Sequence, residues 1–271
     1  MARPENVMQV FSLLDKSNCR KCGEKTCLAF ASAVFQGRSR LSECPVLDPG
    51  VAARFDGSVQ TPGEPEVDPS DELFIRLKQE AAALDLQETA RRVGGEFDGR
   101  VLRVKILGKD MGIDKQANLI SDIHMTPWVT APFLTYLLHC RGVALSGEWI
   151  SMREMTGGKA RYPLFQKRCE QAMKRIGDVY ADLFDDMVQL FRGRQVESPF
   201  DSDISVVLPV LPLVPILICY WRADEGMESS LNVFFDRSIE HNLDCETAFT
   251  LGAGLTQMFE NLARRHGCAL L

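Results

Sequence analysis

Four cysteines lie close together near the start of the 271-residue chain, in the order Cys19-x2-Cys22-x4-Cys27-x16-Cys44. Two thiolates separated by two residues can bind one metal centre from a single turn, and four cysteine thiolates are the usual ligands of an iron–sulfur cluster. Gly23 follows the first pair and allows backbone conformations that a Cβ atom disfavours. The spacing therefore predicts one 4Fe–4S cluster bound by Cys19, Cys22, Cys27 and Cys44.

Two other uses of these cysteines stay open on spacing alone. A four-cysteine zinc site commonly uses two C-x2-C pairs, whereas this segment has one such pair. Disulfides are the second alternative, but the chain has nine cysteines, an odd number that a complete disulfide framework cannot use. We favour iron–sulfur over both.

Basic side chains surround the four cysteines in the sequence. Residues 1–45 contain seven Lys and Arg against four Asp and Glu, although the whole chain has a net charge of −6. Cations near the cysteines would stabilise an anionic cluster, or would form a docking face for an acidic redox partner protein. The simplest alternative is that they are only a solvated surface.

The segment from Cys19 to Pro45 resembles a known four-cysteine iron–sulfur module. The similar features are the cysteine spacing, Gly23, the Phe30-Ala31 helix and the pair Cys44-Pro45. The module occurs in the large subunit of the corrinoid iron–sulfur protein, the gamma subunit of acetyl-CoA decarbonylase/synthase and the B subunit of the Rnf electron-transport complex. This resemblance implies a 4Fe–4S cluster that transfers single electrons, often to a corrinoid cobalt.

Composition narrows the class of protein. The negative net charge argues against nucleic-acid binding, for which a basic surface is typical. The longest apolar run covers residues 206–221 and is interrupted by three prolines, so we expect no membrane span. The polar N-terminus has no signal-peptide core, and we expect a cytoplasmic protein with reduced thiols.

The chain divides into three predicted regions: the cysteine module (1–45), a Pro/Gly-rich linker (46–69) and a larger domain (70–271). We expect the larger domain to be α+β, with a mostly antiparallel sheet and flanking helices. Predicted helices cover 70–94, 132–140, 163–192 (one or two helices) and 246–265. Predicted strands cover 101–106, 117–123 (paired with 101–106), 149–153, 204–208, 213–221 and 231–235.

The larger domain shows no catalytic motif. It has no glycine-rich phosphate loop and no nucleophile elbow, and its histidines are scattered. Asp244 suits the N-cap of the last helix, whereas Asp224, Glu225 and Asp236 could bind a cation. The remaining candidates are four cysteines expected in the core (Cys140, Cys169, Cys219, Cys245) and three tryptophans, more often core than pocket (Trp128, Trp149, Trp221).

The larger domain also resembles a family of uncharacterised domains of anaerobic bacteria and archaea, often fused to this cluster module. The similar residues are 145–149, Gly157-Gly158, 211–215, 221–225 and 234–236 with the helix start at 243–244. This resemblance implies no activity, so whether the chain is an enzyme stays open.

Three functions follow from these features. The leading hypothesis is single-electron transfer to a partner protein or bound cofactor. The second is a non-redox binding or assembly factor in which the cluster is a structural staple. The third is an enzyme acting on a corrinoid or a similar cofactor.

Overall fold

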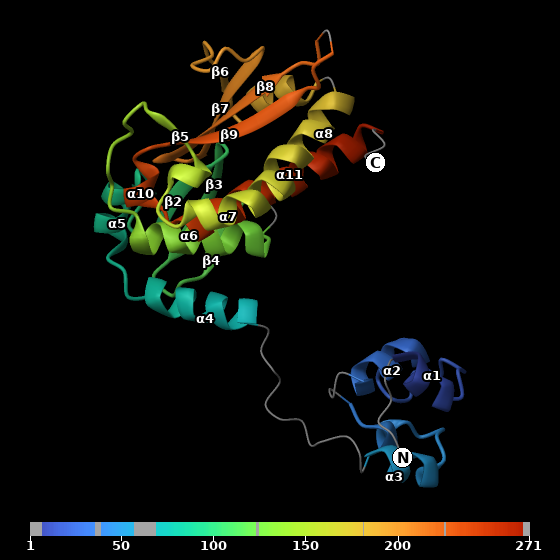
Figure 1. Ribbon diagram of the computed structural model, residues 1–271. Helices are drawn as coiled ribbons and strands as arrows, with labels where there is room; N and C mark the ends of the chain where they lie inside the picture. Colours follow the sequence, from blue (N-terminus) through green and yellow to red (C-terminus); the bar gives the residue numbers. More distant parts are fainter. Residues whose placement is uncertain are drawn as a thin grey trace. The chain divides into compact units, whose positions relative to one another are not determined.

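The computed structural model describes residues 7–35, 39–56, 69–122, 125–180, 182–224 and 226–267, with the backbone alone at 53–56 and 69–71. The chain divides into two compact units, Met1–Pro69 and Ser70–Leu271. We call them the cysteine unit and the body (Figure 1). Each has its own buried apolar core.

The cysteine unit is helical. It contains α1 (Val7–Leu13), α2 (Cys27–Phe35), the 3₁₀ turn η1 (Leu41–Glu43) and α3 (Pro49–Asp56). The helix α3 lies in the range that the sequence predicts to be irregular. Its first turn is fixed by Asp48, whose Oδ1 accepts hydrogen bonds from the N–H groups of Gly50 and Val51 at 2.7 and 3.1 Å. Residues 57–68 of the predicted linker lie outside the described residues.

The body begins with two helices where the sequence predicts one over 70–94. These are α4 (Pro69–Ala81) and α5 (Leu86–Val93). The break occurs because Asp85 caps α5, accepting hydrogen bonds from the N–H groups of Gln87 and Glu88 at 2.9 and 3.0 Å. Gly94 then ends α5 in the left-handed conformation that glycine favours.

Two antiparallel sheets follow. The first has the order β1 (Glu96–Phe97), β2 (Val101–Ile106), β3 (Lys109–Asp114) and β4 (Leu119–Ser121). The sequence predicts that 117–123 pairs with 101–106, and this is wrong: β4 pairs with β3. The reason is a tight turn at Leu107 and Gly108, both with positive φ, which returns the chain as β3 beside β2.

The second sheet has the order β5–β9–β8–β7–β6. Its long strands β7 (Ile204–Leu211), β8 (Val214–Trp221) and β9 (Ser230–Asp236) confirm the predicted strands, and the short edge strands are β5 (Trp149–Ser151) and β6 (Arg194–Gln195). The Leu107 N–H donates to the Pro209 carbonyl at 3.1 Å and links the two sheets. Two antiparallel sheets with packed helices confirm the α+β fold class.

Helices cover the second sheet on one face (Figure 1). Residues 163–192, predicted to form one or two helices, belong to more elements than that. These are α7 (Gly158–Phe165), a π-helical turn (Gln166–Glu170), α8 (Gln171–Val179) and α9 (Leu183–Gln189). The others are α6 (Pro127–His139), α10 (Ile239–Asn242) and the long α11 (Cys245–Arg265), capped by Asp244 as predicted. None of the described helices is long and apolar enough to cross a membrane.

Candidate metal centre and the polar network of the body

The third cysteine of the motif opens α2 and is held by a neighbouring loop. The backbone N–H of Cys27 donates to Asn18 Oδ1 at 2.8 Å, and the Asn18 N–H in return points to Cys27 Sγ at 3.4 Å. Thr26 caps the same helix, since its Oγ1 accepts the Ala29 N–H at 3.1 Å. Asn18 therefore fixes the position of Cys27 and supplies its sulfur with a polar hydrogen.

The loop before α2 has an unusual backbone. Lys16, Asn18 and Arg20 have φ values of 61°, 52° and 61°, and Gly23 has 86°. Left-handed residues that recur in a short loop turn backbone N–H groups toward one concave side, an arrangement that binds anions and occurs at iron–sulfur sites. The loop around Cys19 and Cys22 thus suits an anionic, thiolate-bound group.

The cysteine unit brings three of the four predicted ligands into one apolar cluster. Cys27 and Cys44 are 9% and 8% exposed, and both pack with Phe30 and Leu41. The partly buried Cys22 contacts the same cluster, whereas Cys19 is partly exposed and lies outside it. Within the described residues, no three His, Cys, Asp or Glu side chains are placed to hold a single metal ion.

Cys19 also differs in its electrostatics. The Lys21 backbone N–H, with help from Ser17 and the Lys21 charge, holds the pKa of the Cys19 thiol below its usual value, although partial burial acts in the opposite direction. A lower thiol pKa favours the thiolate, which is the form that binds iron. The donor set of four thiols, the N–H groups of the loop and the apolar packing together fit a cluster.

The cations near the cysteines are mostly exposed. Arg20, Lys21, Lys25 and Arg40 lie on the surface of the cysteine unit, and the Lys16 ammonium lies 5.6 Å from the centre of the Phe11 ring. Among the described residues of this unit, these side chains form no ion pair. Their charge is therefore available to solvent or to a partner.

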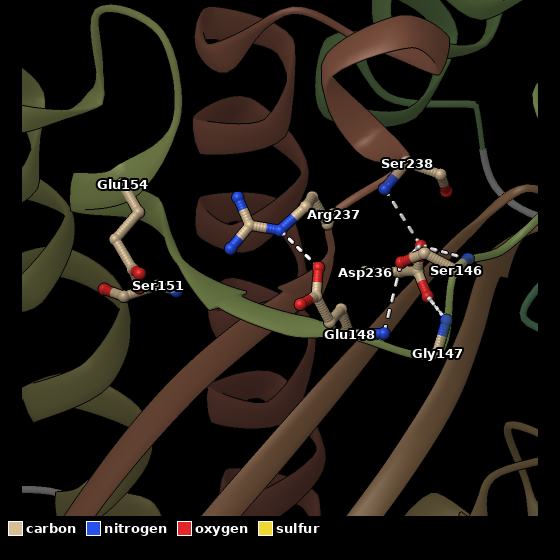
Figure 2. A network of polar contacts seen from close by, with 8 residues as sticks. All are labelled: Ser146, Gly147, Glu148, Ser151, Glu154, Asp236, Arg237 and Ser238. Atoms are coloured by element: carbon tan, nitrogen blue, oxygen red, sulfur yellow. Dashed lines mark hydrogen bonds and ion pairs between the residues drawn. The ribbon is translucent and has the colours of Figure 1, made fainter.

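In the body, two of the segments that resemble the uncharacterised family, 145–149 and 234–236, meet at Asp236. The Asp236 carboxylate accepts hydrogen bonds from the Ser146 and Gly147 N–H groups at 2.9 and 2.7 Å, from Ser146 Oγ at 2.9 Å and from the Ser238 N–H at 2.9 Å (Figure 2). Burial acts to raise the pKa of Asp236, but these donors outweigh it and hold the pKa below its usual value. The hydrogen bonds to the Asp236 carboxylate are thus made by the protein's own donors, and they fix the 146–147 loop to the end of β9.

The other acidic candidates do not join Asp236. Asp224 follows β8 and Asp236 ends β9, so they lie at opposite ends of the antiparallel pair, in which Trp221 faces Ser230 and Ile216 faces Phe235. Asp244 caps α11, and Glu225 lies outside the described residues. The predicted cation site is therefore not assembled among the described acidic residues.

The four body cysteines are buried, as predicted. Their exposed fractions are 1% for Cys140, 0% for Cys169 and Cys219, and 9% for Cys245. Burial raises the pKa of each of these thiols, to about 12 for Cys169.

Of the tryptophans, Trp128 is 40% exposed and lines a cavity, while the partly buried Trp221 donates through Nε1 to the Asp201 carbonyl at 3.1 Å.

Sequence reasoning missed two residues. Asn18 lies nine positions before the Cys27 that it orients. The sequence pattern that could have predicted this role is an asparagine in a turn before a capped helix. Glu170 is 2% exposed in the π-helical turn, where it accepts hydrogen bonds from the Tyr162 hydroxyl at 3.0 Å and the Val233 N–H at 3.1 Å. No sequence pattern marks a buried carboxylate of this kind.

Comparison with known families now assigns the body. Residues 85–258, more than half of the chain, match the family described as "Domain of unknown function (DUF3786)". The chain belongs to this family. Within its DUF3786 region lie the Asp236 network and the body's long strands, and no solved structure matches the chain.

The cysteine unit matches a second family. Residues 14–46 match the description "Putative Fe-S cluster", which covers all four cysteines. Similar curated proteins include an acetyl-CoA decarbonylase/synthase complex subunit gamma of Methanocaldococcus jannaschii (35% identity over 48 residues, 18% of this chain and 10% of that protein). Another is the corrinoid/iron-sulfur protein large subunit of Moorella thermoacetica (32% over 59 residues, 22% of this chain and 13% of that protein).

A gamma subunit of Methanothermobacter thermautotrophicus is 45% identical over 40 residues, 15% of this chain and 9% of that protein. The chain therefore spans about a tenth of the length of these relatives. The similarity is confined to a short segment and supports an iron–sulfur cofactor. The larger parts of those proteins have no matched counterpart in these alignments.

Proposed function

We propose that this protein is a cytoplasmic 4Fe–4S protein that transfers single electrons to or from a partner protein or a bound cofactor. Cys19, Cys22, Cys27 and Cys44 are its four ligands. The observation that carries the proposal is the four-cysteine motif, which matches an iron–sulfur family model and begins in a loop with four residues of positive φ. A bound cubane cluster supplies reversible one-electron transfer.

The residues of the cysteine unit have separable roles. Asn18 orients Cys27, while the loop N–H groups and nearby cations stabilise negative charge at the thiolates. Phe30 and Leu41 pack against Cys27 and Cys44 and exclude water from that side. Cys19 and Cys22 stay partly exposed, and this side offers a route by which a partner approaches closely.

The exposed cations favour an acidic partner surface. Arg20, Lys21 and Lys25 lie next to the more exposed ligands, so an acidic redox protein would be attracted to the side where electron transfer is shortest. A corrinoid protein is one candidate partner, because one relative of the cysteine unit is named as the large subunit of a corrinoid/iron-sulfur protein.

The test is metal content together with the electron paramagnetic resonance spectrum of protein purified without air. We expect about four irons per chain and a spectrum of a reduced cubane cluster after addition of a strong reductant. One zinc and no iron would refute the proposal.

A structural role for the cluster is the second candidate, and one observation favours it. Cys27 and Cys44 belong to the core of the cysteine unit, so removal of the cluster should loosen that core. Spectroscopic titration with reductants of decreasing potential separates the two functions. A cluster that accepts an electron supports transfer, and one that stays oxidised throughout supports the structural role.

A further inference from the structure

A cavity of about 450 Å³ lies within the body, between α6 and α11. Small-molecule sites typically have volumes of about 300–1,000 Å³ and mostly apolar walls. The turn between β2 and β3, the end of β7 and Phe191 after α9 complete the walls, so five separate parts of the fold line the space. The Asp236 network and the cysteines contribute no side chain to this lining.

One stripe of α11 forms the longest wall. Leu251, Leu255, Met258 and Leu262 recur at the spacing of a single helix face, and all line the cavity. At 1.5 Å per residue the stripe is about 16 Å long. Phe133 of α6 is fully buried and also lines the cavity, which is therefore a long apolar slot.

Trp128 places an exposed indole in this slot. It starts α6 and is 40% exposed, although tryptophan is highly buried on average. Gly254 explains how it lies so close to α11: a Cβ atom there would be 3.0 Å from Trp128 Cβ and 3.4 Å from the Trp128 carbonyl oxygen. The close approach leaves an aromatic surface in the cavity that a ligand would cover.

The charged residues of the lining are all basic. Within the described part of the chain, Lys109 and Arg265 line the cavity and no Asp or Glu does, although the chain carries a net charge of −6. Charged residues near them in the sequence form ion pairs, Lys105 with Asp110 and Arg264 with Glu260. Lys109 and Arg265 are exposed and form no ion pair with any described residue.

We propose that this cavity binds a small amphipathic anion. The apolar part of the ligand, a chain or ring system, lies along the α11 stripe and against Trp128. Its acid group, a carboxylate or phosphate, pairs with Lys109 and Arg265. Gln257 and Asn261, which also line the cavity, supply amide groups to orient the acid.

The test uses the full, cluster-loaded chain and isothermal titration calorimetry with decanoate, below its aggregation concentration. Decanol is the matched neutral probe. We expect decanoate to bind at one site and decanol to bind on the order of tenfold more weakly, because the charged contacts are lost. Equal affinity for the two probes, or no decanoate binding, would overturn the proposal.

Two variants locate the site. Lys109→Gln combined with Arg265→Gln should weaken decanoate binding on the order of tenfold and leave decanol binding unchanged. The control combines Lys115→Gln with Arg264→Gln, since both residues are exposed and outside the lining, and should bind as the wild type does. Met258→Trp fills the slot and should weaken both probes.

Other occupants give different results. A second copy of the chain seated in the slot would appear as a dimer that decanoate dissociates, and a membrane would appear as binding to anionic vesicles that persists in the Met258→Trp variant. Either result would replace the small-molecule assignment. Wild-type decanoate binding in the Lys109/Arg265 variant would also refute it.

Discussion

The cysteines of the cysteine unit and those of the body are the same chemical group in opposite settings. Burial alone does not separate them, since Cys27 of the motif and Cys245 of the body are both 9% exposed. They differ in the residues grouped around them. Cys27 shares a small core with Cys22 and Cys44 and is oriented by Asn18. Cys140, Cys169 and Cys245 instead lie in the large apolar core of the body, and Cys219 is buried beside Ser205.

Cys19 of the motif and the four body thiols also differ in the direction of the pKa shift. Backbone donors lower the pKa of Cys19, while burial raises the pKa of the four body thiols. A donor that stabilises a thiolate, with other cysteines close in the chain, thus favours metal binding. Elsewhere the same side chain is a small apolar residue.

A matched pair of substitutions tests this division most directly. Cys27→Ala should abolish nearly all iron binding, because a ligand is lost, whereas Cys169→Ala should leave iron content unchanged. Cys169→Ala should instead lower the free energy of unfolding of the body by about 1 kcal/mol, the cost of a small buried cavity. Iron analysis and denaturant unfolding of both variants provide the measurement. Iron loss in Cys169→Ala would contradict the comparison.

The second prediction concerns the polar anchor of the body. Asp236→Ala leaves the N–H groups of Ser146, Gly147 and Ser238 without their acceptor and should destabilise the body by about 3 kcal/mol. Iron content should not change, since the anchor belongs to the other unit. Asp224→Ala is the control, because that aspartate is exposed. Denaturant unfolding that gives equal losses for the two variants would refute the role of the anchor.

Chemical labelling sharpens the comparison further. In protein stripped of metal, iodoacetamide should react first with Cys19, which is partly exposed and has a lowered thiol pKa. Cys140, Cys169 and Cys219 should react only as the body unfolds, because they are at most 1% exposed. Mass spectrometry over time measures the order. Early labelling of Cys169 would show that burial does not protect it.

The smallest expected effect lies at Glu170. Burial raises the pKa of Glu170, so the folded body binds its proton more tightly than the unfolded chain does. The resulting stability is fully present below the unfolded pKa and is lost as pH rises through the folded pKa. Glu170→Gln should therefore flatten the decline in unfolding free energy above about pH 4. Exposed Glu228→Gln is the control, and an unchanged slope in Glu170→Gln would contradict the prediction.

The sequence predicts the elements whose signals are local. The β7, β8 and β9 strands follow from apolar runs, and the Asp244 cap of α11 follows from its position before a helical pattern. The cysteine motif likewise consists of near neighbours, and its spacing matches a family model.

The helix and strand predictions are wrong where tertiary contacts or an overlooked helix cap determine the structure. Asp85 breaks the predicted helix 70–94 by capping α5. The β3 strand contains Gly112, and glycine is unfavourable inside a strand. Glycine is needed here because β2 comes so close that a Cβ atom would lie 2.9 Å from the Leu102 carbonyl oxygen. Such a close approach is invisible before the strands are paired, as is the cavity between α6 and α11.

The π-helical turn between α7 and α8 has an evolutionary consequence. A π turn holds one residue more than an α-helical turn, so the segment Gln166–Glu170 accommodates an extra residue without rotating the helices on either side. Removal of one residue there would restore a continuous α-helix and keep both flanking faces on the core. A descendant or ancestor of this chain shorter by one residue at this point would therefore keep the fold.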